Sequence, residues 1–409
     1  MAAQQVLPGS AYIKLEVDKQ PATKWNAPPT LIGGGGPAPV VYTDITDDVR
    51  FDQGISWDRG RDAEWEMLNS GSFSATLSNR GRSYDPTTNS WVVGRRPARI
   101  TCYYPTTATA YVQFVGLIDT FEFDYPEMGT DATVALSGVD WFTSTYTARL
   151  VGSFTTSTSI ALAYQQMCNL VAIPAAYQSF ATTTNVIKKQ HMGGTDLQTG
   201  LQLLGVAAFQ YVFVSRTGII TSAAAAGTGS AVATFGDGGG SELPYTNLRA
   251  AVGFQSNAYT GVVVREATTV VNVDHPTWSA QAGTALTADS VTAGATAFTS
   301  QADVDKYGKI LLEIPCVAMI DYTALAAQWA GIMATPGTYW IREIEIRPMA
   351  NPATLFPVVL AAELGQKYTI KLRPLGGGAV VTQTSVLRSI HHQVGGSDGW
   401  VVTWGFTPK

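Results

Sequence analysis

The sequence predicts a mainly β protein with a few short helices, a fold of the α+β class, on three observations. First, Phe73, Ala75 and Leu77 alternate with hydroxyl side chains over residues 72–79, which is the period of two expected of a half-buried strand. Second, alternating segments recur near both ends of the chain, whereas helical spacing is confined to short stretches after residue 150. Third, clusters of turn-forming residues, such as Asn79-Arg80-Gly81-Arg82 and Asp85-Pro86, separate the segments.

At 409 residues the chain is too long for one ordinary core, so several domains are expected. We predict a first β domain at residues 1–150, a middle α+β region at 151–258, and a last β domain at 259–409 with a helical insertion. A Pro- and Gly-rich stretch at residues 21–39 is predicted to be a flexible insertion or contact arm, because four successive glycines suit no packed element. It carries no Gly-Lys-Ser/Thr motif, so it is not a phosphate-binding loop.

Individual elements follow from local patterns. Strands are predicted at about residues 11–17, 72–79, 98–104, 111–124, 132–139, 260–265, 268–273, 339–347, 367–373, 380–391 and 400–406. Helices are predicted after Ser159, after a capping box of Thr195 and Gln198, between Ser300 and Gly308, and from Tyr322 to Met333. A hairpin is expected to turn at Arg216-Thr217-Gly218, and residues 223–240 to be loop.

The composition favours an assembly protein. Charged residues make up only 14% of the chain and hydrophobic residues 45%, so much of the surface is expected to be covered by partners. No apolar run is long enough to span a membrane, and no secretory signal is visible. Residues 1–150 hold 17 acidic and 12 basic side chains, which is the whole net charge of −5 and argues against a nucleic-acid binder. Three widely spaced cysteines are expected to be free, buried thiols.

No catalytic, metal or cofactor site is predicted. His391 and His392 are adjacent, so on a strand they point to opposite faces and cannot readily share one ion. Carboxylates at positions 44–66 could form a glycosidase pair, but the interleaved arginines favour salt bridges. Four tryptophans in the first 91 residues could stack on sugars, although core or interface packing is their more common use. We therefore expect no enzyme activity and no cofactor.

The order of motifs in the first third resembles the first domain of minor tail proteins of long-tailed phages, especially phages of actinobacteria. The motifs that carry the resemblance are Asp44-Ile45-Thr46, the Arg-rich segment around Arg59 and Arg61, the strand at 72–79, Tyr84-Asp85-Pro86, Gly94-Arg95-Arg96-Pro97 and Phe114-Val115-Gly116-Leu117-Ile118. The segment Asp305-Lys306-Tyr307-Gly308-Lys309 also resembles a recurrent tail-protein motif. The arm at 21–39 departs from the compact start that is usual in this family.

An internal echo agrees with this resemblance. Gly94 and Val115 are separated by 21 residues, as are Gly365 and Val386, and each segment continues through a turn into a final Trp-bearing strand. Duplicated β domains at the two ends are therefore expected. In tail hub proteins a first and a last domain, each an antiparallel β-barrel or sandwich like those of the tail tube, surround smaller middle domains, so that three chains present six similar domains to a sixfold tube.

The resemblance implies a structural virion protein that is made in the host cytoplasm and joins the tail tube to the distal tip or receptor-binding apparatus. Its implied partners are two further copies in a homotrimer, the tail tube or distal tail ring, the tape measure, a tip fibre or receptor-binding protein, and genomic DNA that passes the lumen without specific binding. Two alternatives stay open: a hexameric distal tail adaptor, and a cell-wall hydrolase or glycan-binding module. Candidates for contacts between subunits are Arg59, Arg61, Trp65, Arg95 and Arg96, with a charged loop expected at residues 58–66.

Overall fold

The structure is a computed structural model of the 409-residue chain. It describes residues 4–5, 10–19, 40–61, 69–105, 109–126, 131–140, 142, 153–154, 158–171, 173–188, 190–191, 196–252, 259–267, 271–272, 294–317, 321–333, 339–395 and 399–407. The arm predicted at residues 21–39 and the side chain of Trp65 lie outside these residues.

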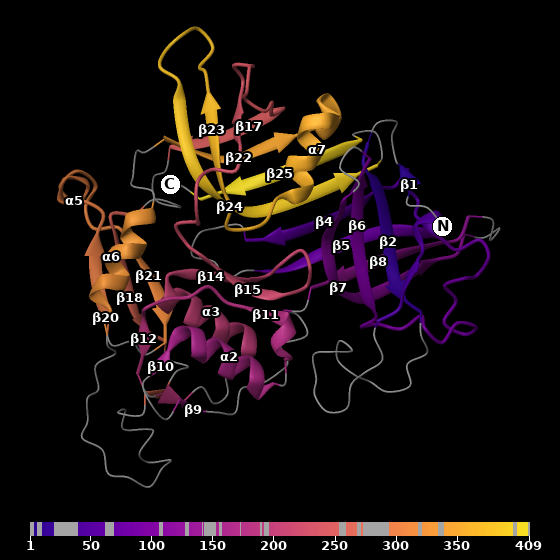
Figure 1. The fold of residues 1–409 in the computed structure, drawn as a ribbon, viewed down its shortest axis with the longest axis horizontal. Coiled ribbons are helices and arrows are strands. Elements are labelled where there is room, and N and C mark those ends of the chain that lie inside the picture. The colour runs from indigo at the N-terminus through magenta and orange to yellow at the C-terminus, as the bar shows by residue number, and fades with distance from the viewer. Residues whose placement is uncertain are drawn as a thin grey trace.

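Most of the described strands belong to one sheet (Figure 1). The sheet has 14 strands, and its main path runs β1-β2-β6-β7-β8-β5-β4-β24-β25-β22-β17. The bounds along this path are β1 Gln4–Gln5, β2 Tyr12–Asp18, β6 Pro97–Tyr104, β7 Thr109–Asp124, β8 Thr133–Val139, β5 Asn69–Ser78, β4 Ile55–Gly60, β24 Val381–Val394, β25 Trp400–Phe406, β22 Tyr339–Ile346 and β17 Asn247–Val252. Off the path, β3 Tyr42–Asp44 pairs with β2, while β16 Thr234–Gly236 pairs with β23 Lys367–Leu372, which in turn pairs with β24. The predicted class, mainly β with short helices, is confirmed.

The two ends of the chain meet inside this sheet. Strand β4, from the first 60 residues, pairs antiparallel with β24, and this pairing sets Trp57 opposite His392 and Arg59 opposite Ile390. The resemblance implied a β-barrel or sandwich domain at each end, but the path of the described strands is open and closes no barrel. The first and last β regions therefore share one continuous sheet through the β4–β24 seam.

The internal echo corresponds to two similar three-stranded meanders, β6-β7-β8 and β23-β24-β25. In each, the long middle strand changes partner: β7 pairs with β6 up to Leu117 and with β8 from there on, while β24 pairs with β23 up to Val386 and with β25 from Leu387. The register differs, since Val115 pairs with Arg99 whereas Val386 pairs with Lys367. The strand order repeats, but the equal Gly-to-Val spacing does not mark equivalent pairs.

The middle of the chain contributes small sheets and most of the helices. The short strands are β9 Ser153–Phe154, β10 Thr158–Ser159, β11 Gln178–Ser179, β12 Val186–Ile187, β13 Gln190–His191, β14 Gln210–Val214, β15 Ile220–Ala224, β18 Gly261–Glu266, β19 Val271–Asn272, β20 Gly294–Phe298 and β21 Leu311–Cys316. The α-helices among the described residues are α2 Ile160–Leu170, α3 Leu197–Ala208, α5 Gln301–Tyr307, α6 Thr323–Ile332 and α7 Pro352–Ala361, and the 3-10 turns are η1 Thr46–Asp48, η2 Ala175–Tyr177 and η3 Pro348–Ala350. Strands β14 and β15 pair across the predicted hairpin turn at 216–218.

Most of the predicted helices begin and end where capping residues in the sequence indicated. Ser159 accepts a hydrogen bond from the Leu162 amide at the start of α2, and Ser300 accepts one from the Asp303 amide at the start of α5. The start of α3 is a correction, because its cap is Asp196, whose carboxylate accepts from the Thr199 amide. Aspartate caps as well as threonine does, and here it stands immediately before the first helical residue.

Two further expectations are corrected. Residues 58–60 were expected to be loop but form the end of β4, because the seam strand β24 offers them partners. Helix α7 was not predicted, since Pro352 and Pro357 interrupt any helical pattern and its apolar residues show no clear period. Pro352 lies at the first helical position, where its missing N–H costs nothing.

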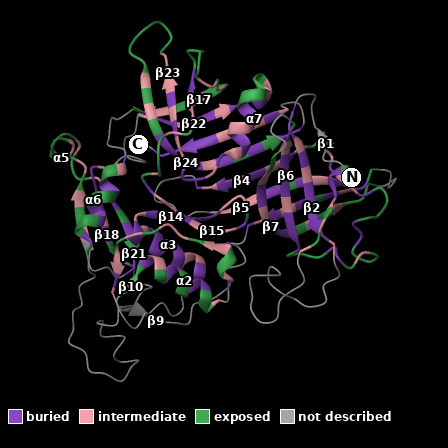
Figure 2. Ribbon diagram, in the orientation of Figure 1, coloured by how far each residue is buried: buried purple, intermediate pink, exposed green. Residues whose placement is uncertain are grey.

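The core runs through both halves of the sheet (Figure 2). Ile13, Leu15 and Val17 of the predicted opening strand are fully buried. Cys102, Cys168 and Cys316 are buried and form no disulfide, as predicted. All six tryptophans among the described residues are at most 8% exposed, namely Trp57, Trp91, Trp329, Trp340, Trp400 and Trp404.

Candidate functional site

An extended candidate functional surface is one face of eight consecutive strands, β7-β8-β5-β4-β24-β25-β22-β17, which we call the polar wall. All seven pairings between these neighbours are antiparallel. Side chains alternate across a strand, so one face of the wall points into the core and the other points away. The outward side chains include Thr120, Glu122, Asp124, Thr133, Ala135, Ser137, Ser72, Ser74, Thr76, Ser56, Asp58, His391, Gln393, Val401, Thr403, Glu343, Glu345, Asn247 and Arg249, and none of these is buried.

Hydroxyl groups dominate the half of the polar wall that comes from the first domain. Neighbouring strands exchange side-chain hydrogen bonds across this face: Ser56 and Ser74 are 2.9 Å apart, and the Ser72 hydroxyl donates to Asp58. The charged outward residues of β4, β5, β7 and β8 are all acidic, while bases appear only in the other half. The surface therefore presents hydroxyl groups and negative charge. Such a surface attracts neither apolar groups nor phosphates.

The opposite, buried face of the seam is aromatic. The rings of Trp57 and His392 stack with centroids 4.6 Å apart, and the Trp400 indole N–H donates to His392 Nδ1 over 3.3 Å. Phe356 of α7 packs edge-on against Trp400 and parallel to Tyr104 of β6, so α7 covers this face. Burial holds the pKa of His392 well below its usual range, and the nearby Arg59 charge acts in the same direction. His392 is thus a neutral core residue, while His391 is exposed on the polar wall, as their alternation predicts.

Close backbone contact at the seam requires glycine at position 60. Gly60 has φ +116°, and a Cβ atom there would lie 2.1 Å from the Arg388 carbonyl oxygen and 2.6 Å from Ser389 Cα. No rearrangement of a side chain could relieve this clash, because both atoms belong to the backbone of β24. The glycine lets β4 end against β24 and lets the Arg61 amide donate to the Arg388 carbonyl over 3.2 Å.

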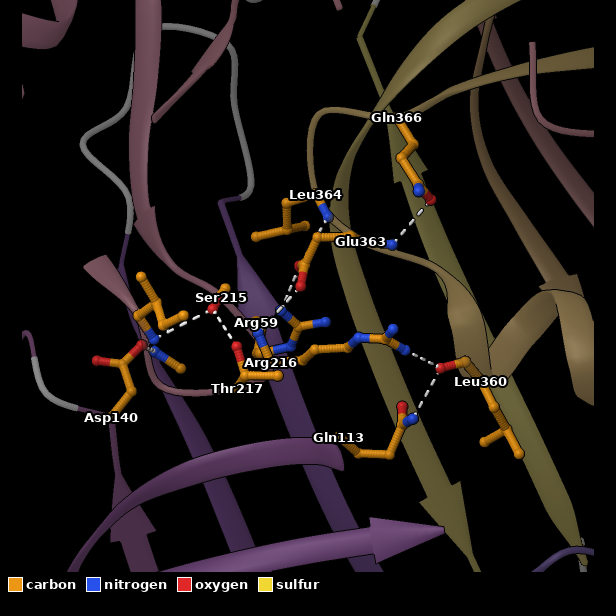
Figure 3. A network of polar contacts seen from close by, with 12 residues as sticks. Arg59, Gln113, Asp140, Ser215, Arg216, Thr217, Leu360, Glu363, Leu364 and Gln366 are labelled. Carbon is orange, nitrogen blue, oxygen red and sulfur yellow. Dashed lines mark hydrogen bonds and ion pairs between the residues drawn. The ribbon is translucent and has the colours of Figure 1, made fainter. Parts of the chain in front are cut away.

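A polar junction ties the seam to the middle region and to the end of α7 (Figure 3). The Glu363 carboxylate accepts from Arg59 Nη1 over 2.5 Å, from the Arg216 amide over 3.0 Å and from the Leu364 amide over 2.9 Å. The Leu360 carbonyl, at the end of α7, accepts from Gln113 of β7 over 2.9 Å and also from Arg216. One carboxylate and one carbonyl thus join strand β4, strand β7, the β14–β15 turn and helix α7.

Asp140 lies beside this junction and is fully buried at the end of β8. Its carboxylate accepts from the Gly71 amide over 2.7 Å and from the Phe142 amide over 2.9 Å. Burial raises the pKa of Asp140 to about 7, although these bonds and the Arg59 charge favour its ionised form. Asp140 is 4% exposed and its carboxylate is held by two backbone amides, which suits a structural group better than a reacting one.

The structure places the predicted contact residues in different environments. Arg59 and Arg61 are 5% and 4% exposed, and within the chain they contact Glu363 and the ring of Tyr211, respectively. Arg96 is 7% exposed, and its Nε donates to the Trp91 carbonyl over 3.2 Å, whereas Arg95 is exposed.

The arginines at 59, 61 and 96 thus hold the single chain together. Contacts between subunits stay a prediction for all five residues, and the side chain of Trp65 lies outside the described residues. Sequence reasoning missed Glu363 and Arg216 because they lie 304 and 157 residues from Arg59, and no local pattern joins them.

Metal and membrane sites are not found in the part of the chain that the structure describes. No group of three or more His, Cys, Asp or Glu side chains is arranged to hold a metal ion there. No helix of the same residues has the length and apolar content needed to cross a bilayer.

Comparison with solved structures identifies the fold over nearly the whole chain. A tail protein from Neisseria meningitidis MC58 matches with a TM-score of 0.55 at 9% identity, covering 98% of this chain and 97% of that chain. The fold is shared with known tail proteins. The 43 kDa tail protein of prophage MuSo2 from Shewanella oneidensis also matches with a TM-score of 0.55, at 12% identity and 97% coverage of both chains. By sequence, neither the protein-family models nor the curated proteins give a match.

Proposed function

We propose that this chain is a structural hub at the distal end of a phage tail, of the long non-contractile type found in phages of actinobacteria. It joins the tail tube or distal tail ring to the tip fibre or receptor-binding protein, contacts the tape measure, and lines the path of the DNA. Support comes from the tail-protein fold and from the sheet that unites the two ends of the chain. The polar wall is the observation that carries the proposal.

The polar wall has the properties required of a DNA path. Its first half is lined by hydroxyls and by Asp58, Glu122 and Asp124, and no outward basic side chain interrupts them. Phosphates are repelled by such a surface, and the outward side chains named above include no Phe, Tyr or Trp ring on which bases could stack. The wall is eight strands wide and its opposite face is packed as core, so only the polar side is suited to face moving DNA.

The duplicated strand order supports a homotrimer. Each chain has two similar meanders within one sheet, β6-β7-β8 and β23-β24-β25, and we call each of them a wedge of the ring. Three chains related by rotation then supply six wedges, which suits a sixfold tube, and cyclic closure satisfies every interface. The alternative within the same class, a hexameric distal tail adaptor, would place six chains in the ring and twelve wedges around it.

The alternative from another class, a cell-wall hydrolase or glycan-binding module, finds less support. An extended glycan groove requires exposed aromatic faces, but the six described tryptophans are at most 8% exposed. The carboxylates considered for a glycosidase pair include Asp44 and Asp58, and these accept hydrogen bonds from the hydroxyls of Thr46 and Ser72.

Electron microscopy of the assembled ring or tail tests the proposal. The expected result is three copies of the 43.5 kDa chain around a central channel, with Asp58, Thr120 and His391 at the channel wall. Six copies would favour the distal adaptor. A polar wall that faces the outside of the particle would refute the assignment of the DNA path.

A further inference from the structure

The polar wall ends in two strands that have a neighbour on one side only. At one end, β7 pairs with β6 only up to Leu117, so among the described strands its residues Thr120–Asp124 pair with β8 alone. At the other end, β17 pairs with β22 and with no other strand among the described residues. Each edge therefore presents backbone N–H and C=O groups that can pair with a further strand.

The directions of the two edges are complementary. The wall has eight strands, and every neighbouring pair is antiparallel, so its first strand, β7, and its last strand, β17, run in opposite directions. Rotation of a copy about a central axis preserves strand direction along that axis. The β17 edge of one copy and the β7 edge of the next would then meet antiparallel, with the polar face on the same side in both. An odd number of strands would have forced a parallel joint.

The outward charges at the two edges also differ in sign. Strand β7 carries the exposed acids Glu122 and Asp124 close to Asp119, with no base among residues 119–126. On β17, the Arg249 side chain is 70% exposed, and its contact with Glu343 is a long 3.5 Å. Opposite charges across strands stabilise a pairing and disfavour wrong partners.

From these observations we infer that the β17 edge of one copy pairs antiparallel with the Thr120–Asp124 edge of a second copy of this chain. The polar wall then continues from copy to copy without a gap, and neither edge of the wall is left open to aggregation. A bulge between Arg249 and Ala250 bends β17, as is common where a strand turns at the rim of a sheet. This inference rests on the proposed ring of identical copies and names the surfaces that close it.

Photo-crosslinking of the purified full chain tests which surfaces meet. In Arg249→p-benzoylphenylalanine the reactive group sits at an exposed position of the β17 edge. The expected product joins two copies and maps, by mass spectrometry of its peptides, to residues 119–126. A matched control carries the same group at Thr382, which is exposed on β24 outside the polar wall and should not react with that peptide. Crosslinks from position 249 to any other region of a second copy would overturn the edge pairing.

Charge reversal tests the same joint by a second readout. The double variant Glu122→Lys/Asp124→Lys should raise the dissociation constant of the assembly by about tenfold or more, measured by sedimentation over a concentration series. Addition of Arg249→Glu should recover part of that loss. Asp305→Lys, an acid exposed on α5, should have no effect. If the reversed charges leave the dissociation constant unchanged, the edges do not meet.

The failure of this inference can be told apart from failure of the proposed function. A trimer whose crosslinks from position 249 lie elsewhere refutes the edge pairing and leaves the homotrimer intact. A hexamer with the expected crosslink keeps the pairing and refutes the homotrimer. A wild-type chain that stays monomeric at every concentration refutes both.

Discussion

The contribution of the polar junction can be measured by the removal of Glu363. In Glu363→Ala the Arg59 guanidinium, which is 5% exposed, loses its carboxylate partner, and the amides of Arg216 and Leu364 lose an acceptor. An uncompensated buried charge typically costs 3–5 kcal/mol, but the Glu363 side chain is 23% exposed, so water can reach the site. We expect the free energy of unfolding to fall by about 3 kcal/mol.

A double-mutant cycle separates the ion pair from its surroundings. Arg59→Met removes the charge and keeps much of the side-chain volume, so it should cost about 2 kcal/mol by itself. In the double variant neither charge is left unpaired, and the expected total cost is about 3 kcal/mol, which gives a coupling energy of about 2 kcal/mol. Urea unfolding followed by circular dichroism measures each free energy.

An exposed ion pair of the same kind supplies the control. The Arg347 and Glu345 side chains are 3.2 Å apart and 47% and 26% exposed. Glu345→Ala should change the free energy of unfolding by less than about 1 kcal/mol. A coupling energy below about 0.5 kcal/mol between Arg59 and Glu363 would show that this ion pair does not hold strand β4 to the segment after α7.

Three further predictions concern the seam and its surroundings. Gly60→Ala should lower the free energy of unfolding by at least about 3 kcal/mol, because φ +116° and the Arg388 carbonyl both exclude a Cβ atom. Gly239→Ala, at φ +70° with open space around it, should lower it by about 1 kcal/mol, and thermal unfolding compares the two variants. Burial raises the pKa of Asp140 to about 7, so its contribution to stability is present below about pH 4 and is lost as pH rises to 7. Asp140→Asn should abolish that decline. An unchanged dependence of stability on pH in the variant would show that Asp140 is not its cause. Burial lowers the pKa of His392, so its contribution to stability is present above about pH 6.5 and is lost as pH falls. His392→Phe should therefore make the free energy of unfolding less sensitive to acid. The same sensitivity in the variant would exclude this histidine as the cause.

Much of the secondary structure could be predicted from the sequence because its signals are local. The alternation of residues 72–79 fixes which face of β5 is buried, and Ser300 with Gly308 fixes the ends of α5. The adjacency of His391 and His392 likewise settled that they lie on opposite faces. Helix α7 could not be predicted because its two prolines and its uniformly apolar residues leave no helical period in the sequence.

The sequence by itself determined the class of the fold, most strand positions and the acidic character of the first domain. Only the tertiary structure decided that β4 pairs with β24, and hence that the two predicted end domains share one sheet. Strand pairing between residues more than 300 positions apart depends on the packing of whole elements, for which no short window carries a signal. The same packing buried Arg59 against Glu363, although the composition of residues 58–66 had indicated an exposed charged loop.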